Sequence, residues 1–211
     1  PTSAGKTFIG EVSALRSICD GRKAVFLLPY KALVNEKYSH FNNTYGLNLG
    51  LRIIRCSGDY TDQVKEYLKG KFDIALFTYE MFLSVGVSTP ESLDQLGLVV
   101  IDEAQFITDP KRGISVELIF TLLRNKNSFG IPLQLIALSA VVGGINHFDE
   151  WLDLKTLMSN ERPIPLREGV IDRTGTVSWL VDGEELEENL LSRHQIRQRK
   201  AKPSTQDLLV P

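Results

Sequence analysis

The chain begins within a heptapeptide, Pro-Thr-Ser-Ala-Gly-Lys-Thr, that restricts the possible fold more than any other stretch. Its Gly-Lys-Thr ending is typical of loops that cradle a triphosphate with backbone N–H groups at a helix N-terminus. In such loops the lysine reaches the terminal phosphates and the hydroxyl group ligates Mg²⁺. Apolar residues recur at helical spacing from Phe8 to Cys19, and Asp20-Gly21 follows them as a stop signal. The sequence therefore predicts a phosphate loop that opens a helix.

A strand of the parallel sheet normally leads into a loop of this kind. The full pattern also has a small residue immediately before the position of Pro1. Because the loop stands at the first residue, we expect that strand to be missing and the chain to be an excerpt of a longer protein.

The composition is that of an ordinary globular protein, with 43% hydrophobic and 24% charged residues among 211. Two cysteines and 3 histidines indicate neither a disulfide framework nor a zinc site. The sequence contains no apolar run of membrane-spanning length and no signal peptide, so we expect an intracellular protein without membrane or zinc partners. It would be cytoplasmic in a prokaryote or nuclear in a eukaryote. With a net charge of −2, any nucleic acid must be bound by a local surface.

Short apolar, β-rich runs alternate with stretches of helical periodicity. The runs expected to form strands are residues 24–28, 51–56, 73–78, 98–102 and 134–139. The stretches expected to form helices are residues 31–45, 61–68, 79–85 and 115–124. This alternation predicts an α/β fold with a mostly parallel sheet and helices on both faces. Ligands of such sheets bind where the strands end, which directs attention to the residues after each strand.

The pattern changes near residue 160, which divides the chain into a main domain, residues 1–160, and a short β/α extension, residues 161–211. Residues 162–166 should be extended because they contain two prolines. Residues 176–181 are expected to form a strand that ends in an Asp182-Gly183 turn. Residues 184–200 are acidic at the start and basic at the end, which favours a helix. The extension is then either a linker into a second domain or an appended hairpin and helix.

The apolar run at residues 98–101 ends in Asp102-Glu103-Ala104-Gln105. A carboxylate at such a strand end is the usual partner of a phosphate loop, because it holds the Mg²⁺ that bridges the phosphates. The second carboxylate would orient or deprotonate the attacking water. Two adjacent acids could also form a solvated turn, but their combination with Gly-Lys-Thr in one α/β domain favours a nucleoside-triphosphate site.

Six segments in the right order resemble the motifs of superfamily-two helicases. The segments that resemble motifs I, II and III are residues 1–7, 102–105 and Leu138-Ser139-Ala140. Those that resemble motif Ia, the Gly-Asp turn and motif Ib are residues 28–36, Ser57-Gly58-Asp59-Tyr60 and Thr78-Tyr79-Glu80. Residues 162–170 are similar to the stretch that leaves the first motor domain in the superkiller-like branch. The resemblance covers residues 1 to about 170 and is strongest to the archaeal-type DNA-repair helicases of that branch.

The resemblance implies a RecA-like first motor domain that uses ATP and Mg²⁺, with a role for each matching residue. The residues implied to contact ATP are Thr2, Ser3, Ala4, Gly5, Lys6 and Thr7. Lys6 would bind the β- and γ-phosphates, while Thr7 and Asp102 would bind Mg²⁺. Glu103 would act on the attacking water, and Gln105 would sense the γ-phosphate. The residues implied to couple hydrolysis to strand binding are Ser139 and Ala140, and those implied to grip the sugar-phosphate backbone are Pro29, Lys31, Gly58, Asp59, Thr78 and Glu80.

Each backbone-gripping residue also has a purely structural interpretation. Gly58-Asp59 is a turn dipeptide by composition, and Thr78 could cap the helix that follows it. Two positions depart from the family pattern. Val141 stands where the family usually has Thr, so a hydroxyl group that could relay a hydrogen bond is missing there. Gln105 stands where close relatives usually carry His, but its amide still donates and accepts hydrogen bonds.

The implied activity is that of an ATP-dependent DNA helicase with 3′-to-5′ polarity, in which a second motor domain of the same polypeptide closes over this one. Alone, this chain should hydrolyse ATP slowly, because an arginine supplied across the cleft is worth orders of magnitude in related NTPases. An RNA helicase of the same family is an alternative, since no residue separates the two substrates. A nucleotide-binding module that no longer translocates is another. A GTPase is disfavoured because residues 125–128, Asn-Lys-Asn-Ser, lack the Asp of the guanine-binding motif.

Overall fold

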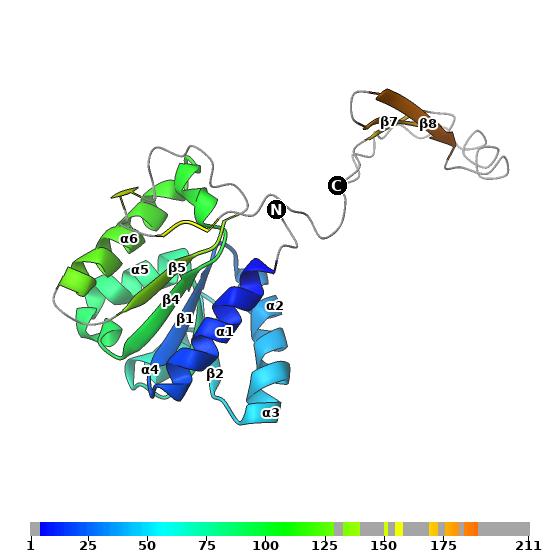
Figure 1. Ribbon diagram of the computed structural model, residues 1–211. Helices are drawn as coiled ribbons and strands as arrows, with labels where there is room; N and C mark the ends of the chain where they lie inside the picture. The colour runs from blue at the N-terminus through cyan, green and yellow to red at the C-terminus, as the bar shows by residue number, and fades with distance from the viewer. Residues whose placement is uncertain are drawn as a thin grey trace. The chain divides into compact units, whose positions relative to one another are not determined.

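The computed structural model describes residues 5–128, 133–139, 150–151, 155–157, 169–172, 176–181 and 184–189 (Figure 1). The chain divides into two compact units, Pro1–Glu161 and Arg162–Pro211, and each contains a sheet of its own. Some residues for which the sequence makes predictions lie outside the described residues. These are Thr2, Ser3, Ala4, Ala140, Val141, residues 162–166 and the Asp182-Gly183 turn.

The first unit is built on a five-stranded sheet in the order β2-β3-β1-β4-β5. The strands are β1 (Lys23–Leu28), β2 (Ile53–Cys56), β3 (Ile74–Thr78), β4 (Leu96–Ile101) and β5 (Gln134–Ala137). Every neighbouring pair is parallel, so all five strands end at the same edge of the sheet. The predicted α/β fold with a parallel sheet is confirmed.

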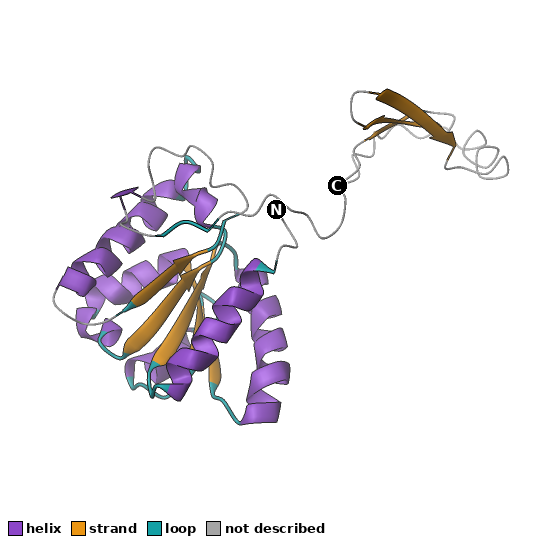
Figure 2. Ribbon diagram, viewed as in Figure 1, coloured by secondary structure: helices purple, strands orange, loops and turns teal. Residues whose placement is uncertain are grey.

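Helices cover both faces of this sheet, as the alternating pattern predicts (Figure 2). They are α1 (Lys6–Cys19), α2 (Lys31–Phe41), α3 (Leu47–Leu49), α4 (Thr61–Leu68), α5 (Tyr79–Ser88) and α6 (Gly113–Ser128). The helix expected over residues 31–45 leaves α-helical geometry after Phe41 and continues as a π-helical turn, Asn42–Gly46. The described residues of this unit also form 3-10 turns at Pro90–Leu93 and Ala104–Thr108.

Successive side chains of the central strands β1 and β4 point to opposite faces of the sheet, and both faces are buried under helices. Phe26 and Val100 belong to an apolar core that includes residues of α1 and α2. Leu27 and Val99 belong to a second core that includes residues of α4, α5 and α6. The near-continuous apolar runs in the sequence are therefore the consequence of a sheet between two helical layers.

The first half of helix α1 contacts the sheet through a small residue rather than its large apolar ones, whereas Ile18 near its end packs against the core. Gly10 and Ala14 are buried, whereas Phe8 is 66% exposed and Val12 is 48% exposed. A Cβ atom added at Gly10 would lie 3.1 Å from Cγ1 of Val100, so the absence of a side chain allows the helix to approach β4 closely. The helical spacing of the apolar residues predicts the helix correctly, but the exposed Phe8, Ile9 and Val12 do not mark its buried side.

The second unit contains an antiparallel sheet of β6 (Gly169–Ile171), β7 (Thr176–Val181) and β8 (Glu184–Asn189). The strand expected at residues 176–181 is confirmed. The helix expected over residues 184–200 is wrong at its start, because residues 184–189 form β8; residues 190–200 lie outside the described residues. Antiparallel pairing of Trp179 with Leu186 and of Val181 with Glu184 gives the backbone a ladder partner, which overrides the helix propensity of glutamate and leucine.

The packing of α1 predicts that Gly10→Val lowers the free energy of unfolding by about 1–3 kcal/mol, as overpacked core positions do. A branched side chain at Gly10 would push against Val100 and Phe26, which lie 3.1 Å and 3.2 Å from the added Cβ atom. Urea denaturation measures the loss. The control, Arg16→Val, changes an exposed position of the same helix and should cost less than about 1 kcal/mol. An equal loss in the two variants would contradict the close approach of α1 to the sheet.

Candidate functional site

Polar residues gather at the edge where the parallel strands end. The N-terminus of α1 lies at this same edge (Figure 1). Pro29 and Asp102 directly follow β1 and β4 there, and Thr78 is the last residue of β3. The topology therefore brings together motifs that are far apart in the sequence, at the edge where ligands of parallel sheets bind.

The first turn of α1 presents an uncapped N-terminus. Gly5 precedes the helix with φ 72° and ψ 15°, a left-handed conformation that favours glycine, and no side chain caps the helix there. Gly5 is exposed, and Lys6 and Thr7 are half-buried. The backbone N–H groups of a first turn have no partner within the helix and carry the positive end of its dipole. This arrangement is suited to an anion such as a phosphate group.

The contact of Gly10 with Val100 sets the height of this first turn relative to the carboxylates. Lys6 lies one helical turn before Gly10, about 5–6 Å toward the N-terminus of α1. Asp102 lies two residues beyond Val100, about 7 Å toward the end of β4. Since α1 begins at the edge where β4 ends, Lys6 and Asp102 lie at a similar height on the same rim (Figure 1).

Asp102 is held by backbone and side-chain partners. Its N–H donates to the carbonyl of Leu27 at 3.0 Å, and its Oδ1 accepts from the N–H of Glu103 at 3.0 Å. Its Oδ2 lies 3.6 Å from Nζ of Lys37 on α2, and both side chains are mostly buried. Burial raises the pKa of the Asp102 carboxyl, and the Lys37 ammonium opposes that rise. The Asp102 carboxylate is therefore partly shielded from water and lies beside one cation, the Lys37 ammonium.

Glu103 adopts a left-handed backbone conformation with φ 55° and ψ 44°, and is alone among the described non-glycine residues in having positive φ. A non-glycine residue rarely adopts this backbone conformation unless its surroundings impose it, and such residues concentrate at functional sites. The buried hydroxyl of Tyr79 donates to the carbonyls of Asp102 and Glu103, the latter at 3.3 Å. Burial raises the pKa of Tyr79, so its hydroxyl keeps the proton that it donates.

Hydrogen bonds join the segment after β5 to the carboxylates. The Ser139 hydroxyl donates to Oε1 of Gln105 at 2.9 Å, and Nε2 of Gln105 donates to Oε2 of Glu103. The backbone is paired as well, since the N–H of Ala104 donates to the carbonyl of Leu138 at 2.8 Å. The amide of Gln105 therefore accepts on one side and donates on the other, as expected for a residue that stands in place of His.

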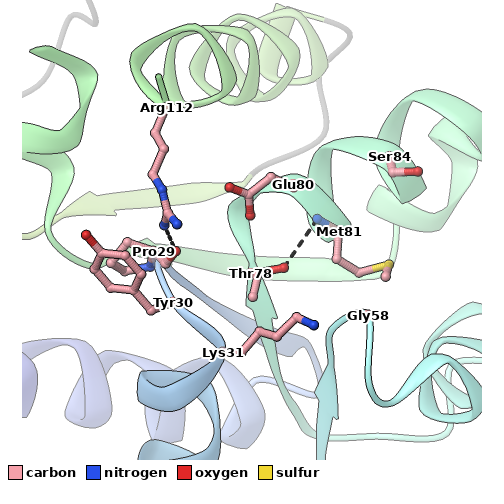
Figure 3. Close-up of a pocket in the computed structure, with 9 residues that line it drawn as sticks. All are labelled: Pro29, Tyr30, Lys31, Gly58, Thr78, Glu80, Met81, Ser84 and Arg112. Carbon is pink, nitrogen blue, oxygen red and sulfur yellow. Dashed lines mark hydrogen bonds between the residues drawn. The ribbon is translucent and has the colours of Figure 1, made fainter. Parts of the chain in front are cut away.

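A groove of about 580 Å³ lies at the ends of β1, β2 and β3 (Figure 3). It brings together five of the six residues predicted to grip a nucleic-acid backbone. These are Pro29, Lys31, Gly58, Thr78 and Glu80. The sixth, Asp59, does not line the groove but forms an ion pair with Lys31 at 2.7 Å. Thr78 also caps α5, because its hydroxyl accepts from the N–H of Met81 at 3.4 Å, so its structural interpretation is confirmed.

Sequence reasoning missed several described residues of this region. In the groove they are Tyr30, Met81, Ser84 and Arg112, and beside the carboxylates they are Lys37 and Tyr79. Arg112 donates to the carbonyl of Pro29 and lies 4.2 Å above the ring of Tyr30, so it holds one wall of the groove. A signal existed for Tyr79, because it stands between two selected residues at the junction of a strand and a helix, where β3 ends at Thr78 and α5 begins. The sequence contains no comparable signal for Lys37 or Arg112.

The part of the chain that the structure describes holds no group of three or more acidic, cysteine or histidine side chains arranged to bind a metal ion. In the same residues, none of the helices combines the length and the apolar character needed to cross a membrane.

Comparisons with known proteins agree with this arrangement. Residues 1–147 match the family described as DEAD/DEAH box helicase. The chain is 37% identical over 184 residues to the ATP-dependent DNA helicase Hel308 of Caldivirga maquilingensis, an alignment that covers 87% of this chain and 23% of that protein. Identity to the proteins of the same name is 38% over 180 residues in Thermococcus kodakarensis and 36% over 186 residues in Pyrococcus abyssi. These alignments cover 85% and 88% of this chain but 15% and 24% of those proteins. The chain therefore spans less than a quarter of the length of each of these relatives.

The environment of Asp102 predicts that Asp102→Asn raises the free energy of unfolding at pH 7. Because burial raises the pKa of this carboxyl in the folded protein, the folded state binds its proton more tightly than the unfolded chain does. Ionisation therefore lowers stability as pH rises through the folded pKa, and asparagine avoids that loss. The gain in free energy of unfolding should shrink as pH falls toward about 3.8, the pKa of this carboxyl in the unfolded chain.

Urea denaturation between pH 4 and pH 7 measures the effect. The matched control is Asp20→Asn, since Asp20 is exposed at the end of α1, and it should change stability by less than about 0.5 kcal/mol. A variant Asp102→Asn that is less stable than the wild type at pH 7 would contradict this description of the carboxylate.

Proposed function

The chain belongs to the DEAD/DEAH box helicase family, and we propose that it is the first motor domain of an ATP-dependent DNA helicase. Its task is to bind ATP at the rim formed by α1 and β4 and to couple hydrolysis to movement along single-stranded DNA. The observation that carries this proposal is the placement of Gly5-Lys6-Thr7 and Asp102-Glu103 at one edge of the sheet.

The residues at the rim fit a magnesium–nucleotide complex. We assign Lys6 to the β- and γ-phosphates, because an ammonium group at an uncapped helix N-terminus adds to a field that already attracts anions. The oxygens of Thr7 and Asp102 are the hard ligands that Mg²⁺ prefers. Bound Mg²⁺ would neutralise charge on the β- and γ-phosphates. Thr2, Ser3 and Ala4 are assigned to the triphosphate from the sequence motif, since they lie outside the described residues.

Glu103 is assigned to the attacking water. Its carboxylate is oriented by the amide of Gln105, and that amide is oriented by the hydroxyl of Ser139. A base that is fixed in position by hydrogen bonds can hold water in line for attack without reorganising during the reaction. The same chain of hydrogen bonds gives Gln105 a position from which the loss of the γ-phosphate could be transmitted to the segment after β5.

The groove is assigned to the sugar-phosphate backbone. It offers a lysine, a threonine hydroxyl and backbone groups at the ends of neighbouring strands, which are donors for phosphate oxygens. Contacts of this kind do not read sequence and need few charges, which agrees with a net charge of −2. The relatives compared above are named DNA helicases, which favours DNA over RNA. Stimulation of the ATPase of the full-length protein by single-stranded DNA and not by RNA tests this preference.

The cycle requires a partner surface. We propose that a second motor domain of the same polypeptide closes over the rim when ATP binds and reopens after hydrolysis, moving the strand in the 3′-to-5′ direction. Closure of this kind completes a catalytic site and excludes water from it. The length of the relatives, of which this chain covers less than a quarter in the alignments above, leaves room for such a domain in proteins of this family.

Two substitutions at the rim should separate binding from hydrolysis in the full-length protein. Lys6→Ala should lower hydrolysis at least about 100-fold by removing positive charge from the transferring phosphate. Glu103→Gln should retain nucleotide affinity within about threefold and stall hydrolysis, because the amide cannot accept a proton. Fluorescent-nucleotide titration and phosphate release measure the two effects. Lys65→Ala, at an exposed position on α4, is the control. Wild-type turnover in Lys6→Ala would contradict the loop assignment.

A single charge in the groove should be visible in the salt dependence of DNA binding. Lys31 lines the groove with a half-exposed side chain, and its ammonium forms an ion pair with the equally exposed Asp59. Lys31→Ala should weaken oligonucleotide binding and reduce the slope of log affinity against log salt by about 0.7, the value for one contact to a single strand. Lys69→Ala, after the C-terminal end of α4, should leave the slope unchanged. Equal slopes in the Lys31 variant and the wild type would contradict the assignment of the groove.

A further inference from the structure

Tyr79 connects the groove to the backbone that carries the carboxylates. Its neighbours Thr78 and Glu80 line the groove, whereas Tyr79 is 0% exposed and points into the apolar core beneath β4 (Figure 3 shows the two neighbours). There its hydroxyl donates to the carbonyls of Asp102 and Glu103. One residue thus spans the distance between two regions to which different ligands are assigned.

The connection is stiff at both of its ends. On the groove side, the Thr78 hydroxyl caps the first turn of α5, so residues 78–80 move together with the start of that helix. On the carboxylate side, the peptide group between Asp102 and Glu103 accepts from the Tyr79 hydroxyl immediately before a residue in the left-handed conformation. The Tyr79 ring between these two ends is rigid and fully buried, so a displacement of residues 78–80 would also displace the Tyr79 hydroxyl.

The direction of the Glu103 side chain depends on this backbone conformation. A left-handed residue is retained only while its surroundings impose that conformation, and the two carbonyls bonded by Tyr79 flank the φ and ψ angles of Glu103. A shift of the Tyr79 hydroxyl would therefore rotate the peptide groups next to Glu103 and with them its carboxylate. The Ser139–Gln105 hydrogen bonds hold the same carboxylate from the other side.

We propose that Tyr79 is a positioning residue that couples occupancy of the groove to the orientation of Glu103, so that a bound strand and a bound nucleotide favour each other through its hydroxyl group. This inference rests on the proposed function, since it needs a strand in the groove and a nucleotide at the rim. It adds a connection on the side of β3 to the one predicted at Ser139 and Ala140.

Coupling of this kind is measured as the ratio between the affinity for one ligand in the presence and in the absence of the other. Ligands that are coupled change each other's dissociation constants by the same factor, commonly between 5-fold and 150-fold. The probes are a fluorescent oligothymidylate and the magnesium complex of a non-hydrolysable ATP analogue, and the protein is the full-length one. The oligonucleotide is titrated without and with saturating analogue, and the analogue is titrated without and with saturating oligonucleotide.

The test variant is Tyr79→Phe, which removes the hydroxyl and keeps the buried ring. The matched control is Tyr67→Phe, because Tyr67 is also 0% exposed in the same core and its hydroxyl donates to the carbonyl of Ser92 at 3.3 Å, away from the carboxylates. Both variants should lose a similar amount of thermal stability. Tyr79→Phe should bring both affinity ratios to within about twofold of 1, whereas Tyr67→Phe should keep the wild-type ratios.

The outcomes separate this inference from the function on which it rests. Wild-type ratios in Tyr79→Phe would overturn the inference while leaving the motor assignment intact. Equal losses of coupling in Tyr79→Phe and Tyr67→Phe would overturn it too, because the effect would then follow from core stability and not from the hydroxyl. A wild-type protein that binds neither probe would refute the proposed function and the inference together.

Discussion

The backbone hydrogen bonds around the end of β4 fix the arrangement on which the site depends. The N–H of Asp102 donates to the carbonyl of Leu27, and the N–H of Leu138 donates to the carbonyl of Ile101, so the ladders on both sides continue to the end of the strand. The N–H group of Ala104 donates to the carbonyl of Leu138. The backbone on both sides of Glu103 is therefore held by main-chain hydrogen bonds to the ends of neighbouring strands, while Lys37 and Gln105 orient the two carboxylates.

This pairing also explains how two ligand regions can share one small edge. Strand β1 lies between β3 and β4, so the ends that carry Thr78 and Asp102 are two strand spacings apart, about 10 Å. The groove and the carboxylate rim are built on neighbouring strands of one rigid sheet. The Tyr79 side chain reaches past one intervening strand, β1, to the carbonyls after β4, and Arg112 reaches from the segment after β4 to the end of β1, so no long pathway is required.

The sequence was sufficient for the sheet and for the grouping of the motifs. Apolar runs bounded by polar residues locate the strands, and parallel strands must end together, so the predicted encounter of Gly5-Lys6-Thr7 with Asp102 followed from topology alone. It was not sufficient for choices decided by packing. Whether α1 buries Val12 or Gly10 depends on how closely the helix approaches β4, and residues 184–189 became a strand because β7 offered a partner. The contact of Lys37 with Asp102 joins two segments that are distant in the sequence, so no local sequence pattern predicts it.

The central claim is that the first turn of α1 and the acids after β4 bind one magnesium–nucleotide complex. A crystal structure of the chain with Mg²⁺ and a non-hydrolysable ATP analogue tests it most directly. The account predicts Nζ of Lys6 within about 3 Å of a terminal phosphate oxygen and a single metal ion between that triphosphate and Asp102. A nucleotide bound elsewhere, or one that contacts Lys6 while Asp102 faces only protein, would contradict the account.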